Sequence, residues 1–338
     1  MDIDDLRKQI DTIDSNIIEQ LNERARIVKQ VGDEKKKENR KVYDPGREHL
    51  VLEKIKKINN GPLDNEILVD IYREIIAGLR KFELDRELKV AYLGPEGTYS
   101  YFAARRKFGT TVKYVPLKGI DAVFKEVDSH RSDYGSVPVE NSMEGGIRET
   151  LNMFVEHDVK VCGEVVLPVH HNLMANDPDG KIKKIYSKPQ VFAQCREWLS
   201  RDFSDVDLVA VGSSAEAAAI AKKEPNSAAI AHAGVAGLYG LKIVSNNIEN
   251  NHNNITRFFV LSHDYPSPVG DDKTVIMCYL KNRVGGLFDI LKPFKEHNIN
   301  LTNIEPLPTK KKVWDYGFYL DLEGHINDDK VKQAIEEV

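Results

Sequence analysis

Arg24 and Lys35 stand out because both lie on the apolar side of a helical pattern at the start of the chain. At about 100° per residue, one stripe roughly 80° wide contains Ile3, Leu6, Ile10, Ile13, Ile17, Leu21, Val28 and Val31. Arg24 and Lys35 fall inside this stripe, about 20° apart in azimuth and about 16 Å apart along the axis. A charge in a packing seam is costly unless an opposite charge meets it. The pattern therefore predicts an anion bound in the seam.

Four more charged residues extend this set: Arg7, Asp44, Arg47 and Glu48. The first 85 or so residues show no His, Cys or Ser pattern suited to covalent catalysis and no metal-ligand cluster. Such a set suits chemistry that needs only positioning and electrostatic stabilisation of developing charge. Arg7 lies about 100° from Arg24 around the helix. We therefore expect Arg7 to reach the ligand from a second copy of the chain in a two-fold dimer.

Residue type and spacing in this segment resemble the helical chorismate mutases. The resemblance rests on Leu6-Arg7, Glu23-Arg24, Gly32 to Lys35 and Asp44-x-x-Arg47-Glu48. It implies an intertwined all-α dimer that rearranges chorismate to prephenate without cofactor or metal. It also implies residue roles: the partner's Arg7, with Arg24 and Arg47, holds carboxylates, Lys35 binds the ether oxygen, and Asp44 and Glu48 bind the ring hydroxyl. The alternative is that the cations snorkel into water and the segment only dimerises.

The third helix departs from the mutase pattern at two positions expected to line the site. Leu79 stands where many members have a serine, and Glu83 where many have a glutamine that donates to the ether oxygen. Glu83 can donate only when protonated, so we expect the mutase rate to fall with rising pH. A mutase disabled by Leu79 and Glu83 is the corresponding alternative.

Length and composition exclude several classes of protein. A chain of 338 residues predicts two or three domains. Its formal charge of −5, with no basic, aromatic-interleaved stretch, argues against nucleic acid as a main partner. Three widely spaced cysteines without CxxC or Cys/His spacing favour a reducing compartment and no structural zinc. No apolar run reaches about 18 residues, so we expect a cytoplasmic protein without a membrane segment.

The hydrophobic pattern changes twice along the chain and predicts three domains. Residues 1–86 have helical periodicity throughout. In residues 87–264, short strands alternate with helices, which predicts an α/β domain with a mainly parallel sheet. After a Pro- and Gly-containing linker, residues 271–338 follow a β-α-β-β-α order. A ferredoxin-like α+β module would need one more strand than this, so its last strand is expected to be missing.

The α/β segment carries a second group of polar residues at expected strand ends. They are Thr98 in Gly94-Pro95-Glu96-Gly97-Thr98, Glu140 and Asn141 in Val137 to Ser142, Ser187 and Gln194 around a helix start, and Thr256 and Arg257 in Asn254 to Phe258. Ligands of open α/β sheets bind where the strands end. A helix N-terminus such as that at Thr98 also attracts anions.

Together these strings resemble prephenate dehydratase. The resemblance implies two α/β lobes, folded like periplasmic binding proteins, that remove carbon dioxide and hydroxyl from prephenate to give phenylpyruvate. By resemblance, Thr256 assists the departing hydroxyl, and Arg257 fixes a carboxylate or orients Thr256. The cleft is completed by Glu140, Asn141, Thr98, Ser187 and Gln194. For Glu140 and Gln194 a purely structural hydrogen bond is the equal alternative, and His170-His171 is expected to be a structural pair.

The C-terminal pattern resembles an ACT domain, which implies feedback regulation by phenylalanine. Gly286, Leu287 and Glu305 are the expected effector-binding residues, in stretches that depart from the usual ACT motifs. The combined expectation is a homodimeric or larger enzyme that converts chorismate to prephenate and then to phenylpyruvate. The alternatives are a dehydratase alone and a non-catalytic ligand sensor.

Overall fold

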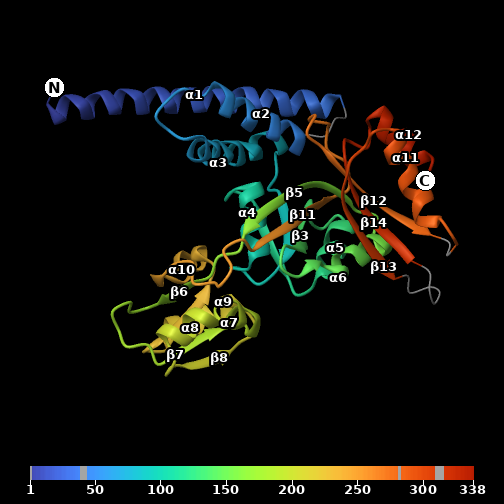
Figure 1. Cartoon of the computed structure of the whole chain (residues 1–338). Coiled ribbons are helices and arrows are strands. Elements are labelled where there is room, and N and C mark those ends of the chain that lie inside the picture. Colours follow the sequence, from blue (N-terminus) through green and yellow to red (C-terminus); the bar gives the residue numbers. More distant parts are fainter. Residues whose placement is uncertain (1, 39–43, 281–282, 309–315) are drawn as a thin grey trace. The chain divides into compact units, whose positions relative to one another are not determined.

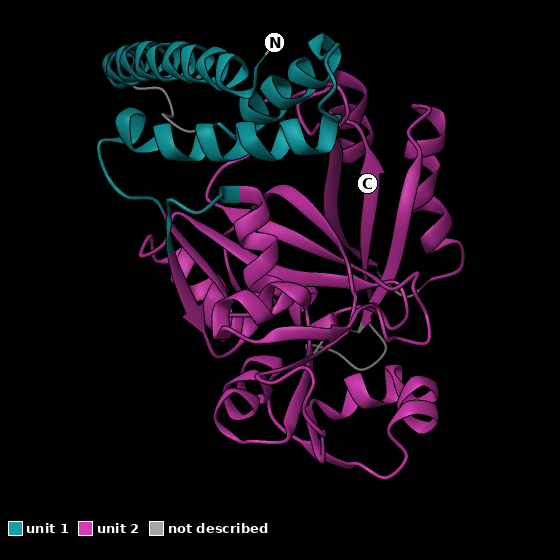
Figure 2. Cartoon of the chain, turned by 90° about the vertical axis from the view of Figure 1, so that its left-hand side faces the viewer, with its two compact units in different colours: residues 1–88, 108–113 teal, residues 89–107, 114–338 magenta. Residues whose placement is uncertain are grey.

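The computed structural model describes residues 2–38, 44–280, 283–308 and 316–338. The chain divides into two compact units. Unit 1 comprises residues 1–88 and 108–113, and unit 2 comprises residues 89–107 and 114–338 (Figure 2). The expected helical segment is in unit 1, and the expected α/β and C-terminal segments are in unit 2.

Unit 1 contains the three expected helices, α1 (Ile3–Lys37), α2 (Pro45–Ile58) and α3 (Asn65–Leu84). Helix α1 is 35 residues long. Figure 1 shows it as one uninterrupted ribbon. Helix α2 begins at a proline, whose fixed φ suits a first turn. Side chains cap α2 and α3: Asp44 accepts from the Gly46 N–H at 2.9 Å, and Asp64 from the Ile67 N–H at 3.0 Å.

Gly32 lies where α1 packs tightly against α3. It is buried, and a Cβ atom there would lie 2.5 Å from the Glu83 carbonyl oxygen. Any larger residue would push the two helices apart. Glycine is unfavourable inside a helix, but at position 32 its lack of a side chain allows this close contact.

The apolar stripe of α1 is exposed along much of its length in the single chain. Its N-terminal members are between 45% and 64% exposed: Ile3, Leu6, Ile10, Ile13 and Ile17. Leu21 and Val28 are half-buried. The expected burial in a seam is therefore not provided by α2 and α3 of the same chain.

The first lobe of unit 2 is built on one mixed sheet in the order β2-β1-β3-β11-β5, with β4 beside β3. Its strands are β1 (Lys89–Leu93), β2 (Lys113–Leu117), β3 (Tyr134–Asn141), β4 (Gly145–Gly146), β5 (Lys160–Pro168) and β11 (Ile255–Ser262). Its helices are α4 (Tyr99–Phe108), α5 (Ile120–Asp128) and α6 (Arg148–Glu156). Strand β11 returns to this lobe from the second lobe and runs antiparallel to both β3 and β5.

The second lobe has its own sheet, in the order β10-β6-β9-β7-β8. Its strands are β6 (Asn172–Ala175), β7 (Lys184–Ser187), β8 (Asp207–Ala210), β9 (Ser227–Ala231) and β10 (Lys242–Ser245). Its helices are α7 (Pro189–Gln194), α8 (Arg196–Asp202), α9 (Ser214–Lys223) and α10 (Ala233–Tyr239). Parallel pairing is found for β7 with β8 and β9, whereas β6 runs antiparallel to β9 and β10. The expectation of a mainly parallel sheet was wrong. Strand β11, which returns from the second lobe, runs antiparallel to β3 and β5, and β6, the first strand of the second lobe, runs antiparallel to β9 and β10.

The C-terminal module has the expected β-α-β-β-α order: β12 (Lys273–Leu280), α11 (Gly286–Glu296), β13 (Leu301–Pro308), β14 (Tyr316–Glu323) and α12 (Asp329–Glu336). Its sheet has the order β12-β14-β13. Side chains of β14 alternate between two cores. Leu320 and Leu322 pack with α11 and α12, whereas Tyr319 packs with Val139 and Phe259 of the first lobe.

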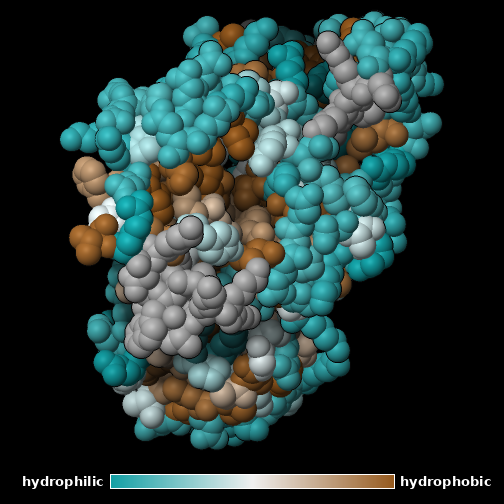
Figure 3. Space-filling model, turned by 90° about the vertical axis from the view of Figure 1, so that its right-hand side faces the viewer, coloured by the Kyte–Doolittle hydropathy of each residue, from teal (hydrophilic) through white to brown (hydrophobic). Residues whose placement is uncertain are grey.

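The surface is largely polar, in line with a charged fraction of 30%. On the face drawn in Figure 3, hydrophilic residues predominate and hydrophobic ones form local patches among them. Among the described residues, no helix combines the length and apolar character needed to cross a bilayer.

Candidate functional site

Lys35 and Glu83 meet where α1 crosses α3. The Lys35 ammonium donates to Glu83 Oε1 at 2.6 Å, and the side chains are 25% and 18% exposed. The resemblance to chorismate mutases predicts that both residues lie at the ether oxygen of the substrate. The structure brings them together, with Glu83 accepting from Lys35 rather than offering a donor of its own.

Glu48 of α2 is held by Arg80, a residue that the predicted mutase set did not include. Its Oε2 accepts from Arg80 Nη2 at 2.9 Å, and Arg80 Nη1 donates to the Phe108 carbonyl oxygen at 2.9 Å. Both charged side chains are buried, at 3% and 6% exposure. Arg80 lies on the apolar face of α3 with Val69 and Ala77. The signal that singled out Arg24, a cation within an apolar stripe, would also have found Arg80.

The remaining predicted mutase residues are spread along unit 1. Arg7 is exposed and pairs with Asp4 of its own helix at 3.2 Å. Arg47 is exposed, and Arg24 and Leu79 are half-buried. Asp44, expected to bind the ring hydroxyl, uses a carboxylate oxygen to cap α2.

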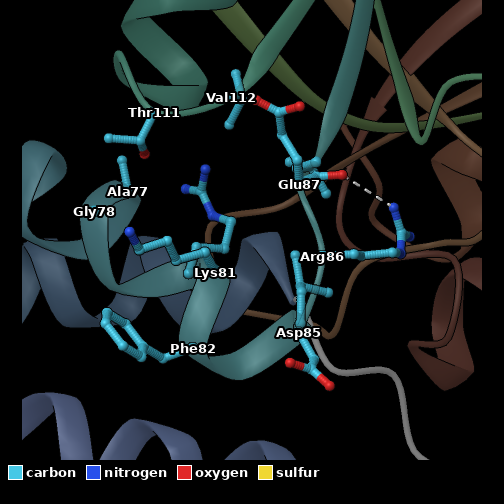
Figure 4. A pocket seen from close by; sticks show the side chains of 12 residues that line it. Ala77, Gly78, Lys81, Phe82, Asp85, Arg86, Glu87, Thr111 and Val112 are labelled. Carbon is cyan, nitrogen blue, oxygen red and sulfur yellow. Dashed lines mark hydrogen bonds between the residues drawn. The ribbon is translucent and has the colours of Figure 1, made fainter.

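Unit 1 also has a pocket of about 560 Å³ at the end of α3. The lining includes Lys81, Phe82 and Asp85, followed by Arg86 and Glu87 (Figure 4). Arg86 Nη1 donates to the Glu87 carbonyl oxygen at 3.4 Å. None of the predicted mutase residues lines this pocket. It is therefore separate from the Lys35–Glu83 contact.

Thr256 and Asn141 lie side by side on paired strands in the first lobe. Their Cα atoms are register partners of β11 and β3. Asn141 Nδ2 donates to Thr256 Oγ1 at 2.9 Å and to Asn254 Oδ1 at 2.8 Å. A hydroxyl has one hydrogen to donate. Because Asn141 is the donor here, the hydrogen of Thr256 remains available for another acceptor.

Arg257 faces the other side of the same sheet, because successive strand residues alternate. Its Nε donates to Glu164 Oε2 at 2.5 Å, and its Nη1 donates to Asp321 Oδ2 of β14. Glu140 Oε2 lies 3.7 Å from the same Nη1. The guanidinium that the sequence assigned to a substrate carboxylate is thus surrounded by three carboxylates of the protein.

Thr98, Ser187 and Gln194 each make a structural hydrogen bond. Thr98 Oγ1 donates to the Leu93 carbonyl oxygen at 2.8 Å and accepts from the Tyr101 N–H at 3.3 Å. Ser187 is fully buried and donates to the Ile230 carbonyl oxygen at 2.9 Å. Gln194 Oε1 lies 2.7 Å from His171 Nε2. This is a structural hydrogen bond, which was one of the two alternatives predicted for Gln194.

Histidines lie in the segment between β5 and β6, which connects the two lobes, and at the start of α10 in the second lobe. Glu249 is buried and accepts from His170 Nδ1 at 2.7 Å and from the His171 N–H at 2.8 Å. Burial lowers the pKa of His171. Burial, with the charges of His170 and His171, lowers the pKa of His232 to about 4. His232 is therefore neutral at pH 7, and its Nδ1 accepts from the Gly234 N–H at 3.1 Å to cap α10.

The predicted effector residues lie in two places of the C-terminal module. Gly286 opens α11, and a Cβ atom there would clash with Leu280 Cδ1. Leu287 follows and is 37% exposed. Glu305 lies on β13, and its carboxylate group reaches 3.1 Å from the place of a Cβ atom on Gly146. Glu305 therefore contacts the hairpin that continues from Asn141.

Three family models match successive parts of the chain. They are chorismate mutase type II over residues 6–84, prephenate dehydratase over residues 90–266 and the ACT domain over residues 274–338. A bifunctional chorismate mutase/prephenate dehydratase of Aquifex aeolicus is 42% identical over 342 residues, which cover 100% of this chain and 94% of the relative. The chain belongs to the bifunctional chorismate mutase/prephenate dehydratase family. The family member of Pseudomonas aeruginosa is also 42% identical, over 98% of this chain and 93% of its own length.

Solved structures support the same assignment for unit 2. The prephenate dehydratase of Arthrobacter aurescens, solved in complex with L-Phe, is 28% identical with a TM-score of 0.68, over 74% of this chain and 85% of its own. The prephenate dehydratase of Staphylococcus aureus is 28% identical with a TM-score of 0.64, over 74% and 94% of the two chains. The order of mutase, dehydratase and ACT segments inferred from the sequence is confirmed.

Proposed function

We propose that the protein converts chorismate to prephenate in its helical domain and prephenate to phenylpyruvate in its two-lobed domain. The observation that carries the second step is the hydrogen bond from Asn141 to Thr256, which leaves the threonine hydrogen free at the end of two paired strands. The ACT domain is the proposed receiver of phenylalanine as a feedback effector, through Gly286, Leu287 and Glu305. The domains are taken as residues 1–86, 87–264 and 271–338.

The dehydratase step needs help only at the leaving group. The bond between the ring and its carboxylate breaks and releases carbon dioxide, the electron pair moves into the ring, and the ring hydroxyl departs as hydroxide, which takes a proton from solvent to become water. Aromatisation drives the reaction forward. Thr256 polarises the departing oxygen with its hydrogen, while Asn141 holds the threonine oxygen in place. Thr98, Ser187 and Gln194 complete the proposed cleft, each through a structural hydrogen bond. Glu140, which the sequence also predicted for the cleft, lies beside Arg257 on the other face of the sheet.

The mutase step needs charge stabilisation rather than a nucleophile. Lys35 binds the ether oxygen as its bond to the ring breaks, with Glu83 beside it. Arg24 and Arg47 hold the substrate carboxylates, together with Arg7 of a second copy. Asp44 and Glu48 set the place of the ring hydroxyl. Lys35 already has an anionic partner in this structure, which supports its role as the cation of an anion site.

We propose a homodimer built on α1, whose exposed apolar stripe offers the contact surface. If Arg7 acts across the interface, mixing Arg7→Ala with Lys35→Ala should restore mutase activity that each variant lacks. Random exchange makes half of the dimers mixed, each with one intact site, so about a quarter of wild-type activity is expected. Each variant mixed with itself is the control. Absence of recovery after verified subunit exchange would contradict a shared site.

A coupled assay on purified protein tests both activities. Chorismate is supplied, and prephenate and phenylpyruvate are followed with and without phenylalanine. The expected result is transient prephenate followed by phenylpyruvate, with a slower second step when phenylalanine is present. Accumulation of prephenate alone would contradict the dehydratase, and unconsumed chorismate would contradict the mutase. Binding of chorismate without turnover would favour a ligand sensor instead.

The cell compartment proposed for this chemistry is the cytoplasm. The three cysteines, Cys162, Cys195 and Cys278, are buried and form no disulfide. Buried cysteines outside disulfides are typical of proteins kept in reducing surroundings. No cofactor or metal is needed for either proposed step.

A further inference from the structure

The Arg257 side chain joins the catalytic strand of the proposed dehydratase to the ACT domain. The guanidinium is only 13% exposed and donates to Glu164 on β5 and to Asp321 on β14. Its plane also lies over the Phe259 ring, with Cζ 5.1 Å from the ring centre. Arg257 is therefore fixed from the ACT side of the sheet, on the face opposite Thr256.

Asp321 is the most buried member of this cluster. It is 0% exposed, and its Oδ1 accepts from the Tyr319 hydroxyl at 2.8 Å while Oδ2 accepts from Arg257. A buried carboxylate needs a cation and hydrogen-bond donors to offset its lost hydration. Arg257 and Tyr319 supply these. Neither carboxylate oxygen of Asp321 is left without a donor, so the cluster has one defined arrangement.

The backbone beside Arg257 is irregular. Strand β11 pairs Thr256 with Asn141 and Arg257 with Glu140, and then its register on β3 shifts between Arg257 and Phe258. Such irregularities bend a strand locally and re-aim its side chains. Arg257 lies between Thr256 and this register shift. The contacts that hold the Arg257 side chain therefore also fix the backbone position of Thr256.

We propose that Asp321 of the ACT domain is a positioning residue of the dehydratase, which acts on Thr256 through Arg257. This inference rests on the proposed dehydratase function. Asp321 touches no substrate. It holds the Arg257 guanidinium, and through it the strand, so that the threonine hydroxyl stays aligned with the leaving oxygen. Small misplacements of a reacting group lower the rate strongly. The ACT domain thus contributes to the basal geometry of the active site as well as to its regulation.

The test compares variants of the full-length protein with prephenate as substrate. Asp321→Asn keeps the shape of the side chain and removes its charge. The kcat of the dehydratase is expected to fall about tenfold, in the range of coupling through packed networks. KM is expected to change little, because no substrate contact is lost. Asp321→Glu should recover part of the loss, and the mutase rate should stay the same in both variants.

Glu323→Gln is the matched control. Glu323 lies on the same strand and is exposed, and Asn300 Nδ2 donates to its Oε1 at 3.0 Å. The dehydratase kcat of the Glu323→Gln variant should match that of the wild type. An equal loss of kcat in Glu323→Gln and Asp321→Asn would overturn the proposal, because it would show a general effect of altering β14. A kcat of Asp321→Asn within about twofold of the wild type would overturn it as well.

Tyr319→Phe covers the case in which Asp321→Asn does not fold, as judged by circular dichroism. It removes only the hydroxyl that donates to Asp321 and should lower kcat about two- to threefold. An unchanged kcat in a folded Tyr319→Phe protein would then count against the proposal. Failure of the wild-type protein to convert prephenate would contradict the proposed function itself. The comparison of variants with the wild type tests only the role of Asp321, so the two outcomes can be told apart.

Discussion

Replacing Thr256 by alanine should lower the dehydratase kcat by about 10²- to 10³-fold and leave chorismate consumption unchanged. Loss of a single hydrogen-bond donor aimed at developing charge has effects of this size. In the structure, Asn141 donates to Thr256 Oγ1, so the hydroxyl hydrogen of Thr256 is available for the leaving oxygen. The measurement is single-turnover conversion of prephenate to phenylpyruvate, with mutase activity as an internal reference.

Two further variants separate chemistry from packing at this buried position. Thr256→Val keeps the shape and removes the hydroxyl, so it should be as inactive as Thr256→Ala. Thr256→Ser keeps the hydroxyl and should retain activity within about tenfold of the wild type. An active Thr256→Val protein would show that the hydroxyl has no part in the reaction.

Replacing Lys35 by methionine should lower the mutase kcat by at least about 10²-fold and spare the dehydratase. Methionine fills a similar volume without the charge, so the loss reports electrostatic stabilisation at the breaking ether bond. The change also leaves the Glu83 carboxylate, 18% exposed, without the ammonium that now donates to it at 2.6 Å. Some loss of thermal stability is therefore expected alongside the loss of rate.

The double variant Lys35→Met with Glu83→Gln separates these two effects. It removes the unpaired carboxylate and should recover stability but not mutase activity. Glu83→Gln alone supplies a neutral amide donor at every pH. It should remain active in the mutase assay, because the amide can donate to the ether oxygen in place of a carboxyl group. Recovery of the mutase in the double variant would show that Lys35 acts only by neutralising Glu83.

Local sequence patterns predicted much of the fold because helix periods, caps and turns depend on nearby residues. Such local patterns predicted the three helices of unit 1 and the β-α-β-β-α order of the C-terminal module. Periodicity missed β6, α10 and β10, which are short and lie next to one another in the second lobe. Strand direction was also missed, because pairing between distant strands leaves no local pattern.

The sequence by itself determined which residue types could do chemistry and the order of the three domains. It identified Lys35 and Glu83, and Thr256 with Asn141, as members of common sites, and the structure brings each pair into contact. Only the tertiary structure decided which way Arg257 points and that Arg80 holds Glu48. The physical reason is that a buried charge takes the nearest opposite charge that packing provides. That partner can come from a strand or helix far along the chain.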